Sequence, residues 1–282
     1  MDLSRLNDNQ KIAVTTTQGP VLVIAGAGTG KTSVLTHRIA YLISELGVDP
    51  NRILAFTFTN KAADEMKDRV NKMIPKSNAQ WIRTYHATCL KILKEDIDKL
   101  DLGWDTSFTI IDEDDQVTLV KQIMKDLNIQ SKVQAKKFVK IIGEIKLDDI
   151  SFDAHSYYDL MRRFEVPDEM DVKAAETIFE TYQKRLKAAD QLDFSDLINL
   201  VHLLLLTKDD VRKKWQEKFD YVLVDEFQDT NLKQFEILKY LVTGQNNVFA
   251  VGDPNQTIYT WRGAYPEVFD DYVEHFKGTQ VI

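Results

Sequence analysis

The sequence predicts an α/β fold, in which helices flank a parallel sheet, with an all-helical subdomain inserted into it. Short apolar runs alternate with helical periodicity up to residue 112 and again from residue 190. Residues 113–189 show mainly helical periodicity and no convincing strand. Buried parallel strands are short continuous apolar runs, and helices repeat apolar residues every three or four positions. We therefore expect residues 1–112 and 190–282 to form one α/β domain around the inserted subdomain.

Short apolar runs mark the strands that we expect in the two α/β parts. These runs are rich in β-branched and aromatic residues, and they cover residues 20–25, 53–58, 80–84, 108–111, 221–224 and 248–251. Helices are expected where apolar side chains recur on one side, at residues 31–44, 60–73 and 86–100. Asn60 belongs to the residue types that cap helices, so we expect it to be the N-cap of the second helix.

The composition is that of an ordinary globular protein with an acidic net charge. Lys and Arg total 36 and Asp and Glu total 44, so the net charge is −8, which argues against an overall basic nucleic-acid-binding protein but not against a local DNA-binding groove. The single cysteine, Cys89, excludes an intramolecular disulfide framework and a cysteine-based zinc site. The longest apolar stretch, residues 197–206, is interrupted and too short for a membrane span, and the first residues show no signal pattern. We expect a cytoplasmic protein.

A glycine-rich loop follows the first predicted strand and precedes the helix at 31–44. It matches the pattern G-x-x-x-x-G-K-[ST] except at its first position, and it consists of Ala25, Gly26, Ala27, Gly28, Thr29, Gly30, Lys31 and Thr32. Such a loop presents backbone N–H groups and a helix N-terminus to phosphate. Lys31 is expected to neutralise the β- and γ-phosphates, and Thr32 to offer its hydroxyl to Mg²⁺. The alternative is a glycine-rich turn that binds nothing, but the order of strand, loop, Lys-Thr and helix favours a nucleotide site.

An acidic pair ends the predicted strand at 221–224. Asp225 at a strand end can hold the Mg²⁺ of a bound nucleotide, and Glu226 can orient and deprotonate an attacking water. An apolar run that ends in Asp-Glu is common, so the pair alone is a weak signal. Together with the phosphate loop it predicts hydrolysis of a nucleoside triphosphate, with Lys31, Asp225 and Glu226 as catalytic residues.

Six motifs follow one another along the whole chain. They are LNDNQK at 6–11, FTFTNKAA at 56–63, TYHAT at 84–88, DFSDL at 193–197, DEFQDTN at 225–231 and VGDPNQTIYTWRGA at 251–264. In this order they resemble the motifs of superfamily-1 DNA helicases of the UvrD/Rep/PcrA group. The resemblance implies a RecA-like domain that binds ATP and Mg²⁺ and contacts single-stranded DNA and single/double-strand junctions, with no membrane partner.

The resemblance also implies roles at the nucleotide. Gln10 would read the adenine edge, because its amide offers both a donor and an acceptor. Gln256 would sense the γ-phosphate and link it to the DNA site, and we count it with the catalytic residues. Arg262 would either contact the nucleotide or pair with an acid beside it.

The same resemblance implies a DNA site on this domain. Phe58, Tyr259 and Trp261 would stack on bases, a contact worth about 1–3 kcal/mol per base and tolerant of sequence. Hydrogen bonds to phosphates or sugars would come from Thr59, Asn60, Thr84 and His86. Each role has a structural alternative, because Phe58 and Trp261 are also typical core aromatics and His86 could pack against its own helix.

Two further expectations concern the larger protein and the insertion. Helicases of this group close the nucleotide cleft with a second RecA-like domain, so we expect a chain without their C-terminal domains (2A and 2B) to be poorly active. A fragment of a RecB/AddA-like helicase–nuclease is the alternative, although the short insertion favours the UvrD/PcrA side.

Within the insertion, a helix would present a basic stripe that consists of Lys132, Lys136, Lys137 and Lys140. This stripe would either touch duplex DNA or simply be solvated.

Overall fold

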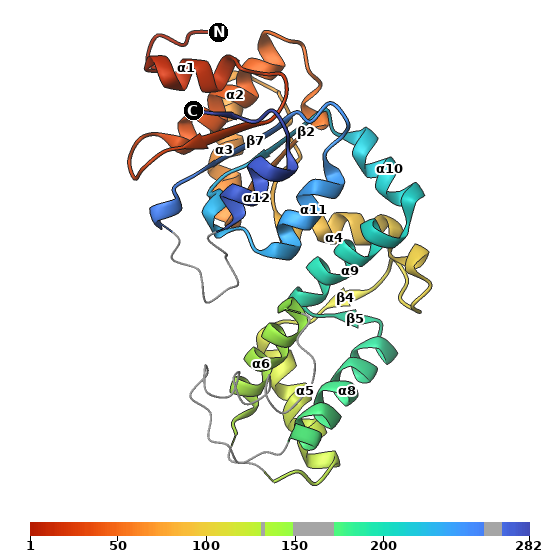
Figure 1. Cartoon of the computed structure of the whole chain (residues 1–282). Helices are drawn as coiled ribbons and strands as arrows, with labels where there is room; N and C mark the ends of the chain where they lie inside the picture. The colour runs from red at the N-terminus through yellow and green to blue at the C-terminus, as the bar shows by residue number, and fades with distance from the viewer. Residues whose placement is uncertain (131–132, 149–171, 257–266) are drawn as a thin grey trace. The chain divides into compact units, whose positions relative to one another are not determined.

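The computed structural model describes residues 1–130, 133–148, 172–256 and 267–282. Two compact units divide the chain (Figure 1). The first unit combines Met1–Thr88 with Leu204–Ile282, and the second unit is Cys89–Leu203. The second unit is wider than the predicted insertion at 113–189, whose boundaries stay a prediction.

The first unit is built on a six-stranded parallel sheet in the order β3-β2-β6-β7-β1-β8. Its strands are β1 (Val21–Ile24), β2 (Ile53–Thr57), β3 (Ile82–Thr84), β6 (Tyr221–Val224), β7 (Val248–Gly252) and β8 (Gln280–Val281). Every residue of β2, β6 and β7 is buried, so both faces of the central sheet are covered. The predicted parallel α/β fold is confirmed.

Helices connect the strands of this sheet. In the first unit lie α1 (Asp8–Thr15), α2 (Lys31–Ser44), α3 (Asn60–Met73), α10 (Asp209–Lys218), α11 (Leu232–Leu241) and α12 (Val268–His275), whereas α4 (Tyr85–Asp96) and α9 (Phe194–Thr207) each run from one unit into the other. Three-residue 3₁₀ turns occur at Pro50–Arg52, Phe227–Asp229 and Pro254–Gln256, and a four-residue one at Ile97–Leu100.

Both faces of the sheet pack against apolar side chains. Alternate residues of β1, β2, β6 and β7 form one core with the buried sides of α1, α2 and α3. The opposite side holds a cluster of aromatic rings around Phe227, with Phe235 of α11 and Phe269 and Tyr272 of α12. The Tyr272 hydroxyl donates to the backbone carbonyls of Val21 and Val248, 3.0 and 3.1 Å away, and so attaches α12 to β1 and β7.

The sequence predictions need three corrections in these elements. Thr59, not Asn60, is the N-cap of α3, because its hydroxyl accepts the Ala62 N–H at 3.1 Å. The helix expected at 86–100 begins at Tyr85, and its α-helical part ends at Asp96. The strand expected at 108–111 contracts to β4 (Thr109–Ile110), which pairs with β5 (Gln191–Leu192) in a separate two-stranded sheet.

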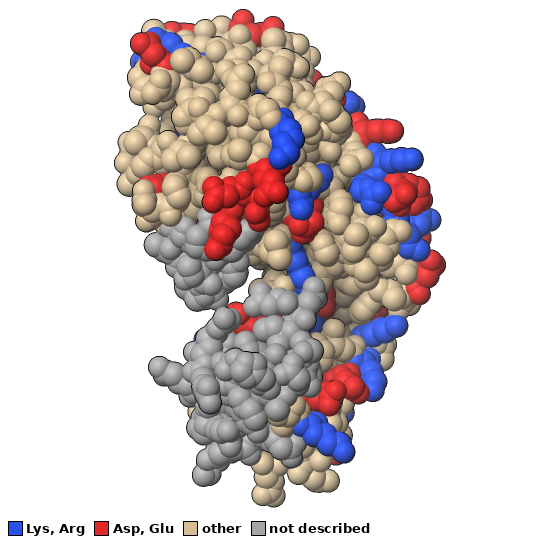
Figure 2. Space-filling view, viewed as in Figure 1, with Lys and Arg blue, Asp and Glu red and all other residues tan. Residues whose placement is uncertain are grey.

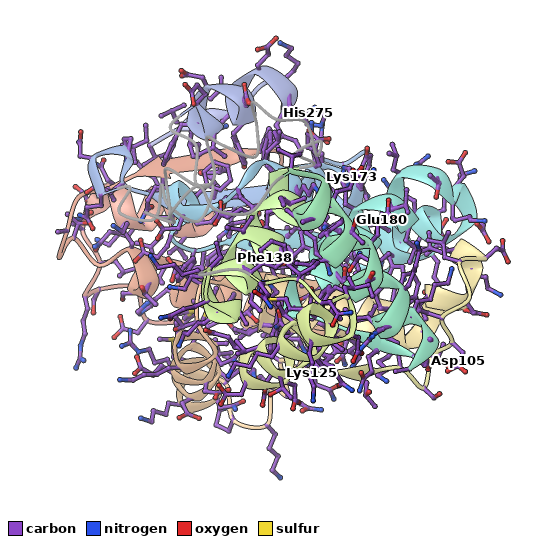
Figure 3. All side chains as sticks on the ribbon, turned by 90° about the horizontal axis from the view of Figure 1, so that it is seen from below. Asp105, Lys125, Phe138, Lys173, Glu180 and His275 are labelled. Carbon is purple, nitrogen blue, oxygen red and sulfur yellow. The ribbon has the colours of Figure 1, made fainter. Side chains whose placement is uncertain are left out.

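The described residues of the second unit are mainly helical. Helical structure was predicted for residues 113–189. Its helices α5 (Glu113–Asp126), α6 (Ala135–Asp148) and α8 (Val172–Ala188) bury their apolar sides in a core of their own. Phe138 lies fully buried in this core, whereas Lys125, Lys173 and Glu180 are exposed (Figure 3).

A buried ionic cluster joins α6 and α8 to the start of α9. The Lys146 ammonium lies 2.6 Å from an Asp193 carboxylate oxygen and 2.8 Å from one of Asp196, and the Tyr182 hydroxyl donates to Asp193 at 2.9 Å. Burial raises the pKa of Asp196 to about 6. Removing one partner from such a buried pair typically costs about 3–5 kcal/mol. The DFSDL motif therefore has a structural role in this unit.

The acidic net charge is visible on the surface. Acidic side chains gather over α12 on the face shown in Figure 2, and this helix contains Asp270, Asp271 and Glu274. No helix in the described ranges combines the length and the apolar character that a bilayer crossing needs.

Candidate functional site

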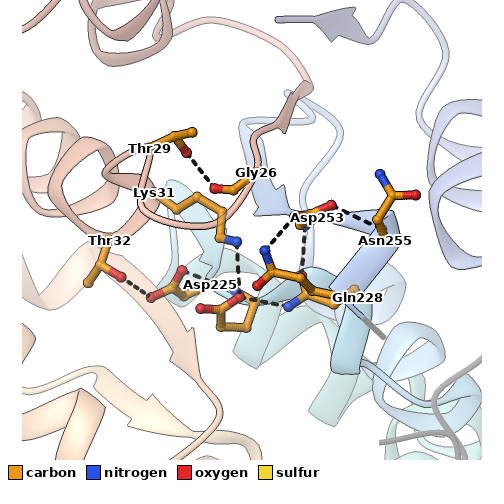
Figure 4. Close-up of polar contacts among 10 residues, drawn as sticks. Gly26, Thr29, Lys31, Thr32, Asp225, Gln228, Asp253 and Asn255 are labelled. Carbon is orange, nitrogen blue, oxygen red and sulfur yellow. Dashed lines mark hydrogen bonds and ion pairs between the residues drawn. The ribbon is translucent and has the colours of Figure 1, made fainter. Parts of the chain in front are cut away.

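The glycine-rich loop between β1 and α2 turns sharply at two glycines. Gly28 and Gly30 have φ angles of +72° and +88°, in the left-handed region that side chains disfavour. The Thr29 hydroxyl donates to the Gly26 carbonyl at 2.7 Å and closes the loop on itself (Figure 4). Helix α2 begins at Lys31, and its N-cap Gly30 supplies no side-chain hydrogen bond. The first N–H groups of α2 and its positive end therefore suit a bound anion.

The strand register places this loop beside two acidic strand ends. Ile24 of β1 pairs with Gly252 of β7, and the Ala25 N–H donates to the Gly252 carbonyl at 3.0 Å. Strand β7 also pairs in parallel with β6, which ends just before Asp225. The carboxyl ends of neighbouring parallel strands meet at one edge, where α/β proteins bind ligands.

Lys31 points toward the acidic pair from the start of α2. Its side chain is only 8% exposed, and its Nζ lies 3.6 Å from Glu226 Oε2. A buried ammonium needs a negative partner, because its desolvation is otherwise uncompensated. Glu226 serves as that partner here.

Asp225 and Thr32 form an oxygen-rich pair. The Thr32 hydroxyl donates to Asp225 Oδ2 at 3.3 Å, and the Glu226 N–H donates to Asp225 Oδ1 at 3.0 Å. Burial and, to a smaller extent, the Glu226 carboxylate raise the pKa of Asp225 to about 6. A hard cation would relieve the cost of this buried carboxylate.

The donor set fits Mg²⁺, which binds oxygen and usually keeps several waters or phosphate oxygens. Within the described residues, no group of three or more His, Cys, Asp or Glu side chains forms a metal site. Mg²⁺ would therefore take only one or two ligands from Thr32 and Asp225, and the rest from phosphate and water.

Glu226 has a strained backbone. Its φ and ψ of 48° and 50° lie in the left-handed region, which is uncommon for a residue other than glycine. Its carboxylate helps to raise the pKa of Asp229 to about 6, a shift that arises first from burial. Asp229 Oδ1 is buried and has no hydrogen-bond partner among the described residues. Backbone strain and an unpaired buried carboxylate oxygen are both typical of functional sites.

A hydrogen-bonded network extends from Glu226 to Gln256 (Figure 4). Gln228 Nε2 donates to Glu226 Oε2 at 2.7 Å, and Gln228 Oε1 accepts the Asp253 N–H at 3.0 Å. Gln256 Nε2 donates to Asp253 Oδ2 at 2.6 Å. The sequence analysis gave no role to Gln228, Asp229 or Asp253. Their position inside two motifs was the available signal.

Gln10 contacts the phosphate loop. Its Nε2 donates to the Thr29 carbonyl at 2.9 Å, and its Oε1 accepts the Asn7 N–H at 3.0 Å within a capping box at the start of α1. A side-chain amide has two N–H groups and two lone pairs, so one of each is left for a ligand. Its expected contact with adenine stays a prediction.

Five of the residues expected to bind DNA lie at or just after the ends of β2 and β3, which are parallel neighbours. Phe58 and His86 are half-buried. The Thr84 hydroxyl accepts the Ala87 N–H at 3.2 Å and donates to Asn60 Oδ1 at 3.4 Å. These five residues therefore lie at or just after adjacent strand ends: Phe58, Thr59, Asn60, Thr84 and His86. Thr59 and Thr84 also cap helices. Tyr259, Trp261 and Arg262 lie outside the described residues.

The fold and the loop define a phosphate-loop nucleotide-binding domain of the RecA-like type. The UvrD/REP helicase N-terminal domain family matches residues 6–277, and the chain belongs to this family. The match agrees with the UvrD/Rep/PcrA resemblance and does not favour the RecB/AddA alternative.

Several named helicases are similar to the chain over nearly its whole length. It is 39% identical to ATP-dependent DNA helicase PcrA of Staphylococcus aureus and 40% identical to the PcrA of Staphylococcus epidermidis, in both cases over 99% of this chain and 39% of the relative. It is 42% identical to a probable DNA helicase II homolog of Mycoplasma capricolum, over 93% of this chain and 36% of the relative. The chain thus spans about two fifths of the length of these relatives.

The buried Asp225 carboxylate predicts a pH-dependent stability. The pKa of Asp225 rises from 3.8 to about 6 on folding, so the folded protein favours the protonated carboxyl. The contribution of this group to the free energy of unfolding is therefore complete below pH 3.8 and is lost as the pH rises through 6. In EDTA at pH 7.5, Asp225→Asn should raise the free energy of unfolding by about 1–3 kcal/mol, and the gain should vanish toward pH 4. Urea unfolding across this pH range measures the difference. The exposed Asp64→Asn is the control, and an equal gain at every pH would contradict the assignment.

Proposed function

We propose that this chain is the ATP- and single-stranded-DNA-binding part of an ATP-dependent DNA helicase. The helicase would move along single-stranded DNA and unwind duplex during repair or replication. The observation that supports this most directly is the Lys31–Glu226 pair beside Thr32 and Asp225, at the mouth of the phosphate loop. Membership of the UvrD/REP family supports the choice of DNA helicase among phosphate-loop proteins.

The proposed hydrolysis uses groups that already face one another. When ATP binds, Lys31 exchanges Glu226 for the β- and γ-phosphates. Thr32 and Asp225 would hold Mg²⁺, which neutralises phosphate charge during transfer. Glu226, released from Lys31, is then a free carboxylate that can orient the attacking water and accept its proton. Lys31 and the loop N–H groups stabilise the charge that develops on the transferred phosphoryl group.

The described part of the proposed DNA site lies at the ends of β2 and β3. The family resemblance adds Tyr259 and Trp261, which lie outside the described residues. Thr59 is suited to a phosphate, because its hydroxyl accepts the Ala62 N–H and keeps its own hydrogen to donate. Phe58 would offer a ring face to a base. Stacking and phosphate contacts carry no sequence information, which suits a protein that moves along any strand.

Rapid turnover is proposed to need arginines from a second RecA-like domain. In other phosphoryl-transfer enzymes such an arginine accelerates turnover by about 10³–10⁵-fold. The extra length of the helicase relatives supports this part of the proposal.

Steady-state ATP hydrolysis, with and without poly-dT, tests the proposal, with Lys31→Ala as the blank. We expect nucleotide binding that Lys31→Ala weakens, DNA binding that Trp261→Ala weakens without loss of nucleotide binding, and turnover close to the blank. Strong poly-dT-stimulated turnover that Lys31→Ala abolishes would refute the requirement for a second domain. A rate of ATP hydrolysis that poly-dT does not change, together with unchanged DNA binding in Trp261→Ala, would instead indicate a DNA-independent ATPase.

A second proposed contact concerns the basic stripe of the insertion. Lys136 and Lys140 are exposed on α6, Lys137 is half-buried, and Lys132 lies outside the described residues. Lys136 Nζ lies 3.5 Å from Glu113 Oε1, an exposed ion pair of the kind that contributes little to stability. The exposed side chains of Lys136 and Lys140 could therefore reach the phosphates of duplex DNA at small structural cost.

Replacing Lys136, Lys137 and Lys140 by alanine should weaken binding to a duplex junction and flatten its salt dependence. Each phosphate contact contributes about −0.9 to the slope of log K against log salt concentration. The three substitutions can therefore remove up to about three such contacts. Fluorescence anisotropy over a salt series measures the slope. The Lys121→Ala, Lys125→Ala double variant is the control, and an unchanged slope in the triple variant would leave the stripe as a solvated surface.

A further inference from the structure

Gln228 lies buried between the ends of two neighbouring strands. Its side chain joins Glu226, which follows β6, to the backbone of Asp253, which follows β7, through bonds of 2.7 and 3.0 Å. Only 3% of the residue is exposed. A carboxylate only accepts and a backbone N–H only donates, so the amide can face in one direction only. Gln228 is thus a fixed strut with a defined donor end and a defined acceptor end.

Gly252 provides the space for this strut. A Cβ atom at Gly252 would lie 2.6 Å from Gln228 Oε1 and 3.1 Å from the backbone nitrogens of Phe227 and Gln228. Gly252 is not among the residues with positive φ, so its backbone conformation does not require glycine. What requires glycine is, first, the close approach of the Gln228 amide oxygen and, second, that of the backbone nitrogens of Phe227 and Gln228. The Gly252 carbonyl, in turn, accepts the Ala25 N–H of the phosphate loop.

Beyond Gln228, the network continues into the 3₁₀ turn Pro254–Gln256. Asp253 Oδ1 accepts the Asn255 N–H at 3.0 Å, and Asp253 Oδ2 accepts Gln256 Nε2 at 2.6 Å. The Gln256 N–H donates to the Asp253 carbonyl at 3.0 Å. A displacement of the Asp253 backbone would therefore move Asn255 and Gln256 with it.

We propose that Gln228 is a positioning residue that couples Glu226 to the Asp253–Gln256 turn, through the space that Gly252 leaves. This inference rests on the proposed function. In the structure, Glu226 Oε2 lies between the Lys31 ammonium and the Gln228 amide. Once phosphate takes Lys31, the Gln228 amide is the contact that orients Glu226. The new position of Glu226 then reaches the turn through the Gln228–Asp253 hydrogen bond.

Hydrogen exchange of individual backbone amides tests this coupling without relying on turnover. The amides of Asn255 and Gln256 report on the turn, and they are compared in the full chain with Mg²⁺ and either ADP or the ATP analogue AMP-PNP. In the unmodified chain, AMP-PNP should slow their exchange about tenfold more than ADP, within the ordinary range of coupling between sites. In Gln228→Ala, AMP-PNP should still bind, but the difference should fall below about twofold.

Gly252→Ala should reproduce the effect of Gln228→Ala, because the added Cβ displaces the strut. In the double variant, any loss beyond that of Gln228→Ala reports the contact of the added Cβ with the backbone nitrogens of Phe227 and Gln228. Gln18→Ala is the matched control, because this exposed glutamine bonds Tyr221 in the same unit and lies outside the network. Thermal unfolding checks that each variant folds.

The outcomes separate the inference from the proposed function. If AMP-PNP does not bind, or binds equally well to Lys31→Ala, the proposed function fails. If it binds but the unmodified chain shows no AMP-PNP-specific protection, or Gln228→Ala keeps it, the coupling role is wrong. Full AMP-PNP-specific protection in Gly252→Ala would also overturn the coupling role. If Gln228→Ala changes the exchange rates of Asn255 and Gln256 equally with ADP and with AMP-PNP, Gln228 has a structural role only.

Discussion

The arrangement of this protein depends on a buried ammonium that has to be neutralised. Lys31 is held at the start of α2 with little exposure, and Glu226 supplies the negative charge 3.6 Å away. The parallel register of β1, β7 and β6 makes this contact possible, because it brings the phosphate loop and the acidic strand end to one edge of the sheet. A phosphate that replaced Glu226 would keep the buried Lys31 ammonium neutralised.

The residues around this site combine structural and proposed functional roles. The hydroxyls of Thr59 and Thr84 cap α3 and α4, and the same two residues are proposed DNA contacts. Gln10 closes a capping box on α1 and bonds the phosphate loop at Thr29. A side chain that both caps a helix and contacts a ligand is already held in position before the ligand binds. Such preorganisation reduces the ordering cost of binding.

The sequence predicted the elements whose pattern is local and strong. The range of α2 was predicted correctly, because its start is marked by the loop and its length by apolar periodicity. Strand β8 was missed, because it has two exposed residues and depends on pairing with β1. The cap of α3 was placed one residue late, because Thr59 and Asn60 are both capping types and only the backbone geometry separates them. The sequence motif marked Gln228 but could not show its contacts with Glu226 and Asp253, because these form only where the ends of β6 and β7 lie side by side.

The exchange of partners at Lys31 is the central claim, and a crystal structure of the chain with Mg²⁺ and AMP-PNP tests it most directly. We expect Lys31 Nζ to leave Glu226 for the β- and γ-phosphates, while Thr32 and Asp225 face the cation and Gln228 keeps its bond to Glu226. A nucleotide bound at this loop with the Lys31–Glu226 pair still at its present distance would refute the exchange, as would a nucleotide bound elsewhere.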